Sequence, residues 1–380
     1  MKHYLSITDM TPHEMTALFD LADRMAAGDI ADLKHVADVV RDHTARRAGS
    51  AETEQAAPAG KVLGLAFFEP STRTQLSFTS AMLRLRGSTL GFAGAGGTSV
   101  AKGETLADTV RIMSGYCDLL VMRHPHDGAP RLASQYASVP VINAGDGAHE
   151  HPTQALMDLF TIRKQKGKIE GLTVGLVGDL LYGRTVHSLA PGLAAFGARL
   201  VFVSPPSLRV PDYVVEKVRR AGADSPTSVE RLADVVGALD VIYMTRVQRE
   251  RFPSEEAYEA VRGSYRLDGP LMAAAKPDCL VLHPLPRVTE IAPEVDSDPR
   301  ALYFRQAALG VPVRMALVSI LLAMAPARAR REYPPTVERP ADQTLCPNER
   351  CVLNHERHVP LAAMEEKGER CLYCDSLRRM

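Results

Sequence analysis

Residues 61–87 read KVLGLAFFEPSTRTQLSFTSAMLRLRG, and this stretch decides the fold of the first half of the chain. The apolar run at 61–68 predicts a buried β-strand, and apolar residues at helical spacing predict an amphipathic helix over 71–87 that stops at Gly87. The turn between them places hydroxyl and guanidinium groups at the start of the helix, on Ser71, Thr72, Arg73 and Thr74. The N–H groups of a first helical turn have no partner within the helix, so they bind anions readily. The stretch therefore predicts a phosphate site, and an ordinary capped helix is the alternative.

The bulk composition describes a globular chain with balanced charge. Its 380 residues are 46% hydrophobic and 24% charged, enough to bury the cores of two domains. Lys+Arg and Asp+Glu both number 45, so no net positive field attracts nucleic acid or an anionic membrane, and we predict neither partner. The sequence begins without a signal-peptide pattern and has no apolar run of membrane-spanning length, so we predict a cytoplasmic location.

Short apolar runs alternate with helical patterns through most of the chain. This alternation is typical of parallel sheets covered by helices on both faces. We predict the α/β class, with two domains that each contain a parallel sheet flanked by helices, over residues 1–150 and 151–307. A last apolar helix over 308–325 is expected to pack back on the first domain. Residues 42–60 lack apolar periodicity and are interpreted as a flexible insertion.

Polar residues follow the predicted strands, and open parallel sheets bind ligands outside the carboxyl ends of their strands. Arginine binds carboxylate and phosphate groups through planar, bidentate contacts. Each arginine by itself is more often a surface ion pair, but four of them at equivalent strand ends predict ligands with several negative charges. No nucleophile–base set is apparent, so we expect catalysis by positioning and charge stabilisation. The four arginines are Arg73, Arg123, Arg184 and Arg246.

Four of the six cysteines lie near the C-terminus, in the pattern Cys-x4-Cys followed by Cys-x2-Cys. Two close pairs of thiolates predict a closed, structural zinc site, and four unrelated reduced cysteines are the alternative. His355 and His358 lie between the pairs and are weaker candidate ligands. We therefore predict a linker over 326–342 and a small zinc-ribbon-like module over 343–380. The predicted zinc ligands are Cys346, Cys351, Cys371 and Cys374.

Seven segments resemble, in this order, the catalytic chain of aspartate carbamoyltransferases over residues 1 to about 325. Ser-Thr-Arg-Thr at 71–74 and His-Pro-Thr-Gln at 151–154 mark the wider carbamoyltransferase group, which includes the ornithine enzyme. Arg-Val-Gln at 246–248 and His-Pro-Leu-Pro-Arg at 283–287 mark the aspartate enzyme. The tail resembles the zinc domain of the regulatory chain of the same enzyme, without its nucleotide-binding domain, so we expect no nucleotide effector site. The segments are PSTRTQLSF, SVAKGETLADT, VMRHP, NAGDGAHEHPTQALMDLFTI, GDLLYGRTVHS, MTRVQRERF and VLHPLPRVTEI.

The resemblance implies that carbamoyl phosphate binds the first domain and L-aspartate the second. They would react to N-carbamoyl-L-aspartate and phosphate, in de novo pyrimidine biosynthesis, without a catalytic cofactor. The implied carbamoyl phosphate ligands are Ser71, Thr72, Arg73, Thr74, Arg123, His151 and Gln154. The implied aspartate ligands are Lys102, Arg184, Arg246, Gln248 and the backbone carbonyls of Pro284 and Leu285. The implied catalytic residues are Arg73, Thr74, Arg123 and His151. By itself, His151 at the start of a helix is more typical of a cap or packing residue.

A glycine-rich loop, AGAGGTSVAKGET, carries Ser99 and Lys102. The resemblance implies that both residues enter the site of a neighbouring subunit in a homotrimer, with Thr98 or Ser99 supplying the hydroxyl. By itself the loop is typical of a solvated surface segment. Two other functions stay open: a carbamoyltransferase with a different amine acceptor, and a non-catalytic zinc-ribbon interaction protein.

Overall fold

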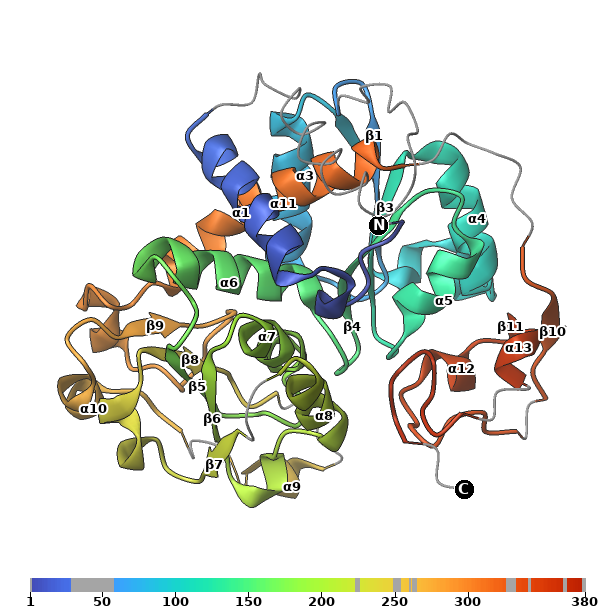
Figure 1. Cartoon of the computed structure of the whole chain (residues 1–380). Coiled ribbons are helices and arrows are strands. Elements are labelled where there is room, and N and C mark those ends of the chain that lie inside the picture. The colour runs from blue at the N-terminus through green and yellow to red at the C-terminus, as the bar shows by residue number, and fades with distance from the viewer. Residues whose placement is uncertain are drawn as a thin grey trace. The chain divides into compact units, whose positions relative to one another are not determined.

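The chain forms two compact units, which are described separately here (Figure 1). Unit 1 consists of Met1–Thr153 and Val311–Met380, and unit 2 of Gln154–Gly310. Most of the predicted insertion, residues 42–57, lies outside the described residues. The computed structural model describes residues 2–28, 58–222, 226–248, 254–259, 261, 265–325, 333–340, 343–364 and 368–377.

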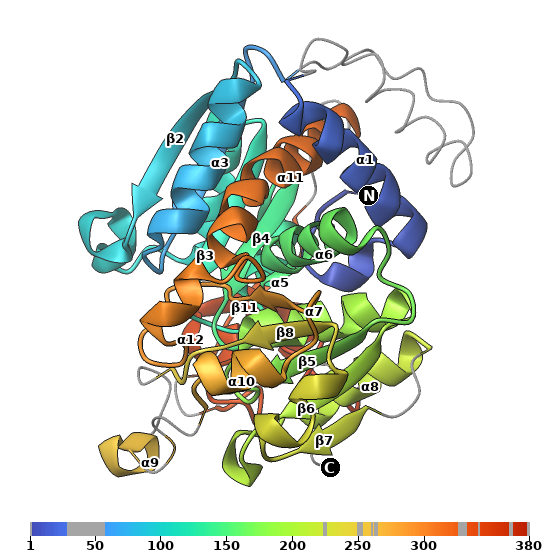
Figure 2. The same ribbon diagram turned by 90° about the vertical axis from the view of Figure 1, so that its left-hand side faces the viewer.

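Unit 1 is built on a four-stranded sheet with the order β2-β1-β3-β4, and every pairing is parallel. Helix α3 packs against β1 and β2 (Figure 2), whereas α4 and α5 lie on the other side of the sheet (Figure 1). The strands are β1 (Val62–Phe67), β2 (Ser88–Ala93), β3 (Leu119–His124) and β4 (Val141–Asp146). The helices are α1 (Pro12–Ala26), α3 (Thr72–Arg84), α4 (Leu106–Tyr116) and α5 (Ala129–Tyr136), with 3₁₀ turns η1 (Ile7–Asp9), η2 (Ala95–Gly97) and η3 (Ser99–Lys102).

Helix α3 forms as the apolar spacing predicts, because Phe78, Ala81 and Met82 are fully buried. The predicted stop at Gly87 is wrong. The helix ends at Arg84, and the left-handed residue after it is Arg86, with φ 59°. The N–H of Gly87 then donates to the carbonyl of Met82 (3.0 Å), the closing bond of a Schellman turn.

Unit 2 contains a five-stranded parallel sheet with the order β7-β6-β5-β8-β9. Together with the sheet of unit 1, this second sheet confirms the predicted α/β class with two parallel sheets. The strands are β5 (Thr173–Val177), β6 (Arg199–Val203), β7 (Thr227–Val229), β8 (Val241–Met244) and β9 (Leu280–Leu282). The helices are α7 (Arg184–Ala195), α8 (Asp212–Arg220), α9 (Glu255–Glu259) and α10 (Gly269–Ala274), with 3₁₀ turns η4 (Pro206–Leu208), η5 (Leu232–Asp234), η6 (Val236–Ala238) and η8 (Pro293–Ser297).

Two helices run from one unit into the other: α6 (Pro152–Lys166) and α11 (Tyr303–Ala323). Helix α11 begins five residues before the predicted start at residue 308. In unit 1 the guanidinium of Arg314 lies 5.1 Å from the ring of Phe78, so this half of α11 contacts α3. Helix α11 is long and apolar enough to cross a membrane, but 72% of its most apolar window is buried, which is typical of a core helix.

The C-terminal tail, residues 333–377 as described, forms a small module of unit 1. Strand β10 (Thr336–Glu338) pairs antiparallel with β11 (His358–Pro360), and the short helices α12 (Val352–His355) and α13 (Leu361–Met364) flank β11 in sequence. The predicted linker over 326–342 is therefore wrong in its second half, because residues 336–338 form a strand of the module.

Candidate active site

In the sheet of unit 1, the strand order reverses between β1 and β3, which makes this pair the topological switch point. Strand β2 lies on one side of β1 and β3 on the other, so the ends of β1 and β3 border the crevice where open α/β sheets bind ligands. Phe67 at the end of β1 is in register with Arg123 near the end of β3. The N–H of Phe68 donates to the carbonyl of Arg123 (2.9 Å), which ties the two strand ends together.

Helix α3 starts at this crevice, directly after β1. Its N-cap residue is Ser71, whose hydroxyl makes no capping hydrogen bond, and no acidic residue lies in the first turn. An ordinary capped helix would use that hydroxyl for its own N–H groups. Thr74 is buried, whereas Thr72 and Arg73 are exposed. The first turn of α3 thus presents donors to an incoming anion.

Arg123, near the end of β3, has a carboxylate beside it. Its guanidinium lies 3.0 Å from Glu69, and both side chains are mostly shielded from water. Glu69 follows β1 in the sequence, but its role as the partner of Arg123 was not predicted. The ion pair with Glu69 restricts the orientations that the Arg123 guanidinium can adopt.

His151 is buried immediately before α6, and the loop that leads to it is organised by Asp146. The carboxylate of Asp146 accepts from the N–H of Gly128 (2.7 Å), the amide of Asn143 (3.0 Å) and the N–H of Glu150 (3.1 Å). Burial alone would raise the pKa of Asp146, but His149 and these donors hold it below its usual range. Sequence reasoning gave no such role to Asp146, the last residue of β4.

In the sheet of unit 2, the strand order reverses between β5 and β8, so this pair is the corresponding switch point. Gly178 follows β5 with φ +113°, and a Cβ there would lie 2.5 Å from the carbonyl oxygen of Thr245, so only glycine allows the two strand ends to approach. The carboxylate of Asp179 then accepts from the N–H groups of Tyr182 (2.9 Å) and Gln248 (3.3 Å). Asp179 therefore links the loops that carry Arg184 and Gln248.

Burial and hydrogen bonding act in opposite directions on the carboxyl group of Asp179. Burial raises the pKa of Asp179 to about 6, against the lowering effect of its hydrogen bonds and of Arg246. Arg184 is buried as the first residue of α7, and the amide of Gln248 donates to the carbonyl of Tyr182 (2.9 Å). In unit 2, Arg184 therefore follows β5, and Arg246 and Gln248 follow the adjacent strand β8.

The loop after β9 is fixed by His283. Its Nδ1 accepts from the N–H of Leu285 (2.7 Å), and its Nε2 lies 2.7 Å from Glu290. Leu285 adopts φ 55°, which is rare for a residue other than glycine and is typical of functional segments. The positions predicted to supply backbone carbonyls, Pro284 and Leu285, are therefore held in a defined conformation.

Gln154, the last predicted carbamoyl ligand, belongs to a buried network of unit 2. Its amide donates to Asp158 (2.8 Å), which also accepts from the hydroxyl of Tyr243 (2.8 Å) and the amide of Gln306 (2.6 Å). The other end of Gln306 accepts from the N–H of His283 (3.0 Å). Asp158 thus connects Gln154 with the loop of Pro284 and Leu285, a link that no sequence pattern signalled.

The loop with Ser99 and Lys102 forms the exposed turn η3. The hydroxyl of Thr98 donates to the carbonyl of Ala95 (2.7 Å) and accepts from the N–H of Val100 (3.3 Å). Thr98 is therefore used inside the loop, which favours Ser99 for the hydroxyl role. Whether these residues serve a neighbouring subunit stays a prediction.

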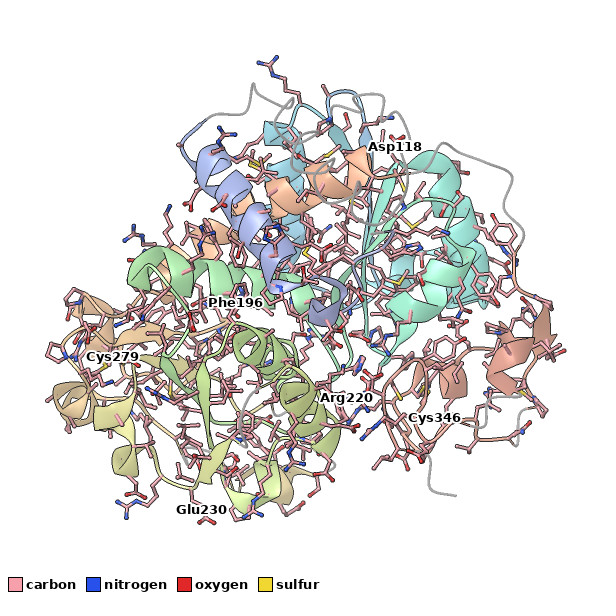
Figure 3. The ribbon with its side chains drawn as sticks, in the orientation of Figure 1. Asp118, Phe196, Arg220, Glu230, Cys279 and Cys346 are labelled. Atoms are coloured by element: carbon pink, nitrogen blue, oxygen red, sulfur yellow. The ribbon has the colours of Figure 1, made fainter. Side chains whose placement is uncertain are left out.

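The four C-terminal cysteines are buried together, and all four sulfur atoms lie within 4.8 Å of one another (Figure 3 labels Cys346). The Sγ atoms of Cys346 and Cys374 are 3.5 Å apart, and those of Cys351 and Cys371 are 3.8 Å apart. Disulfide sulfurs lie about 2 Å apart, so these are thiols. A tetrahedral Zn²⁺ with Zn–S bonds of about 2.3 Å separates its sulfurs by about 3.8 Å, which this arrangement fits. His355 lies outside the cluster, with its Nε2 2.7 Å from the carbonyl of Glu349.

Sequence models of two known domains cover this fold. Residues 2–164 match the carbamoyl-P binding domain of aspartate/ornithine carbamoyltransferases, and residues 170–321 match their Asp/Orn binding domain. The chain belongs to the aspartate/ornithine carbamoyltransferase family. This confirms the predicted family and the carbamoyltransferase class of enzyme. Neither domain model extends beyond residue 321.

Curated carbamoyltransferases cover most of the chain. The aspartate carbamoyltransferase catalytic subunit of Lachnoclostridium phytofermentans is 47% identical over 327 residues, which are 86% of this chain and 99% of that protein. The corresponding subunit of Methanothermobacter thermautotrophicus is 56% identical over 274 residues, 72% of this chain and 87% of that protein. These names agree with the predicted function and with aspartate as the acceptor.

Solved carbamoyltransferase structures have the same fold. The catalytic subunit of M. jannaschii aspartate transcarbamoylase superimposes with a TM-score of 0.70 at 42% identity, covering 84% of this chain and 98% of that chain. The Trypanosoma cruzi enzyme in complex with aspartate and phosphate gives a TM-score of 0.72 at 36% identity, covering 84% and 94%. The two-sheet architecture is therefore that of the family.

Proposed function

We propose that this carbamoyltransferase uses L-aspartate and forms N-carbamoyl-L-aspartate and phosphate, the reaction expected in de novo pyrimidine biosynthesis. The observation that carries the proposal is the placement of four predicted arginines at the switch points of two parallel sheets, Arg73 and Arg123 in unit 1 and Arg184 and Arg246 in unit 2. A phosphate and two carboxylates match this set of cations in charge. The acceptor named for the relatives supports the same substrate.

In unit 1, the first turn of α3 would hold the phosphate through Ser71, Thr72, Arg73 and Thr74. Arg123 and His151, with Thr74, would donate to the carbonyl oxygen of the carbamoyl group, and Gln154, the first residue of unit 2, would accept from its amide. The amine of aspartate attacks the carbamoyl carbon, the carbonyl oxygen becomes a tetrahedral oxyanion, and these donors stabilise its charge. The bond to phosphate then breaks, and the departing phosphate is a suitable acceptor for the proton of the amine.

In unit 2, Arg184 and Arg246 would bind the two carboxylates of aspartate, with Gln248 assisting. Lys102, from the η3 loop of a neighbouring subunit, would also assist. The backbone carbonyls of Pro284 and Leu285 would orient amino groups. Ornithine carries an ammonium group where aspartate has its second carboxylate, so two arginines disfavour it by like charge. No catalytic cofactor is needed for this chemistry.

An acceptor assay tests the proposed substrate. Full-length protein with carbamoyl phosphate is expected to carbamoylate aspartate and to leave ornithine and other primary amines unreacted, as measured by mass spectrometry of the products. Turnover of another amine with none of aspartate would favour the second candidate, a carbamoyltransferase with a different acceptor. No turnover with any amine would favour the non-catalytic alternative.

We propose further that Cys346, Cys351, Cys371 and Cys374 hold a structural Zn²⁺. The support is the set of sulfur–sulfur distances, which match a tetrahedral site, and the complete burial of the four thiols. We expect about one zinc per chain by elemental analysis, and loss of that zinc in Cys351→Ser with a lower melting temperature. His355→Ala is the matched control, because it changes a candidate ligand between the two pairs and should retain the metal. A metal-free wild type of unchanged stability would contradict the site.

The remaining expectations concern assembly and location. We propose a cytoplasmic homotrimer in which Ser99 and Lys102 complete a neighbouring subunit's site, supported by their exposure on η3. Higher assembly stays open. We also propose that the chain alone has no nucleotide effector site, and a nucleotide-dependent change in the aspartate saturation curve would contradict this.

A further inference from the structure

The tail packs directly on unit 1 and shares its core. Val352, Leu353 and Val359 of the tail belong to one buried apolar cluster with Leu132 and Tyr136 of α5. The four cysteines lie in the same cluster. The tail is thus attached to the unit that is proposed to bind carbamoyl phosphate, by burial of apolar surface that is continuous with the core.

The first polar contact joins the tail to the loop after β3. It is made by Asp127, which lies four residues beyond Arg123. The backbone of Asp127 donates to the carbonyl of Arg350 (2.9 Å) and accepts from the N–H of Val352 (2.9 Å), a short parallel bridge to the tail. The carboxylate of Asp127 accepts from the amide of Asn348 (2.9 Å) and, on its other oxygen, from the N–H of Ala148 (2.9 Å). Asp127 therefore joins the tail to the loops after both β3 and β4.

The close approach at this loop is visible at two neighbouring positions. Gly128 has φ +84°, and a Cβ there would lie 2.6 Å from the backbone of Tyr373, so the tail occupies the space that a side chain would need. The rings of His126 and His355 stack with centroids 3.7 Å apart. Burial and His355 lower the pKa of His126 to about 4, so the ring of His126 is neutral in this stack at physiological pH.

The second polar contact holds the loop before His151. Asp375 binds Arg131 through both oxygens (2.8 and 3.1 Å) and lies 3.1 Å from Nε2 of His149, two residues before His151. The other ring nitrogen of His149 lies 2.9 Å from Asp146, the residue that organises this loop. Burial would lower the pKa of His149, but Asp146 and Asp375 raise it to about 10, so the imidazole is a buried cation between two carboxylates.

A third contact reaches the segment after the Ser99–Lys102 loop. The carboxylate of Glu356 accepts from the N–H of Leu106, the first residue of α4 (3.0 Å). The tail therefore touches each of three segments of unit 1 that lead to or from predicted site residues. The first two contacts come from residues close to the cysteines: Asn348 and Arg350 lie between Cys346 and Cys351, and Asp375 follows Cys374.

We propose that the metal-organised tail is a positioning module for the carbamoyl half of the site, with Asp375 and Asn348 as positioning residues that hold the loops of His151 and Arg123. The proposal rests on the proposed carbamoyl phosphate site and zinc site. The tail makes no described contact with the first turn of α3, so it should affect the donors to the carbonyl oxygen without affecting the phosphate cradle.

Two ligands separate these effects: phosphonoacetamide, which carries a phosphonate and an amide carbonyl, and inorganic phosphate. In the zinc-loaded full-length protein, Asp375→Asn should weaken phosphonoacetamide binding about tenfold by calorimetry, as expected for a weakened hydrogen bond to a charged group, with phosphate affinity nearly unchanged. Asparagine tolerates the left-handed backbone of Asp375 (φ 62°), so the variant removes charge without imposing strain. Amide hydrogen exchange of residues 143–151 should accelerate in the same variant.

Asn348→Ala tests the other loop independently, with faster exchange expected over residues 124–128. Arg357→Ala is the control, because this exposed tail residue pairs with Glu338 inside the module and should change neither ligand. Zinc content is measured for every variant. Unchanged phosphonoacetamide affinity in both loop variants would overturn the inference, as would equal weakening of both ligands. A wild type that binds neither ligand would overturn the proposed site itself, and this inference with it.

Discussion

Arg73→Ala is expected to reduce kcat/KM for carbamoyl phosphate about a thousandfold, which is the scale reported for removal of one preorganised donor from developing charge. Arg73 is the second residue of α3, where its guanidinium adds to the N–H groups and the positive end of the helix dipole. Without the guanidinium of Arg73, a dianionic phosphate keeps its hydrogen bonds to the backbone N–H groups but loses the charge-assisted contact. Steady-state phosphate release and calorimetric phosphate binding both measure the loss.

Arg84→Ala provides the matched control for this change. Arg84 is exposed in the last turn of the same helix, so the substitution removes the same charge and alters helix propensity equally at the opposite end. It should leave phosphate affinity within about twofold, because surface substitutions away from a site have small effects. Similar kinetics for the two variants would remove the basis for a phosphate site at the start of α3.

The sequence predicted the central strands well because buried parallel strands are continuous apolar runs. The strand β2, with sequence STLGFA, was missed because it lies at the edge of its sheet and no residue in it is fully buried. Strand β7 has only three residues, too few for any periodicity. The strand β10 was interpreted as part of a linker, since the prolines and charged residues around it indicate a loop and its partner β11 lies about twenty residues further along the chain.

The sequence predicted those site residues that lie at the carboxyl ends of strands. The rule that ligands bind at the carboxyl ends of parallel strands located Arg73, Arg123, Arg184 and Arg246. It gave no role to Asp146 or Asp179, because each holds backbone N–H groups of a separate loop, and such contacts leave no pattern in the sequence. The cysteine spacing predicted a metal site, but the contacts of Asp375 and Asn348 join residues more than 200 positions apart.

Arg246→Ala is expected to raise KM for aspartate at least about a hundredfold and to lower kcat. One carboxylate of bound aspartate would then have no guanidinium partner, which removes about 3 kcal/mol of binding free energy from charge-assisted hydrogen bonds. Arg246 lies after β8, next to Asp179 and Gln248, on the loop that borders the switch point of unit 2. Arg246→Lys should recover only part of the loss, since a lysine ammonium does not reproduce the planar fork. Arg231→Ala, at a side chain that is 76% exposed in the same unit, should behave as wild type.

The two arginine variants together assign one ligand to each unit. Arg246→Ala should bind phosphate and phosphonoacetamide like the wild type and fail only when aspartate is added, whereas Arg73→Ala should lose phosphate affinity itself. Direct binding measurements separate these cases, because KM mixes binding with chemistry whereas calorimetry does not. Loss of phosphate affinity in Arg246→Ala would contradict a separate aspartate site in unit 2. Retention of full aspartate turnover in that variant would contradict the role of its guanidinium in carboxylate recognition, and with it the charge argument that excludes ornithine.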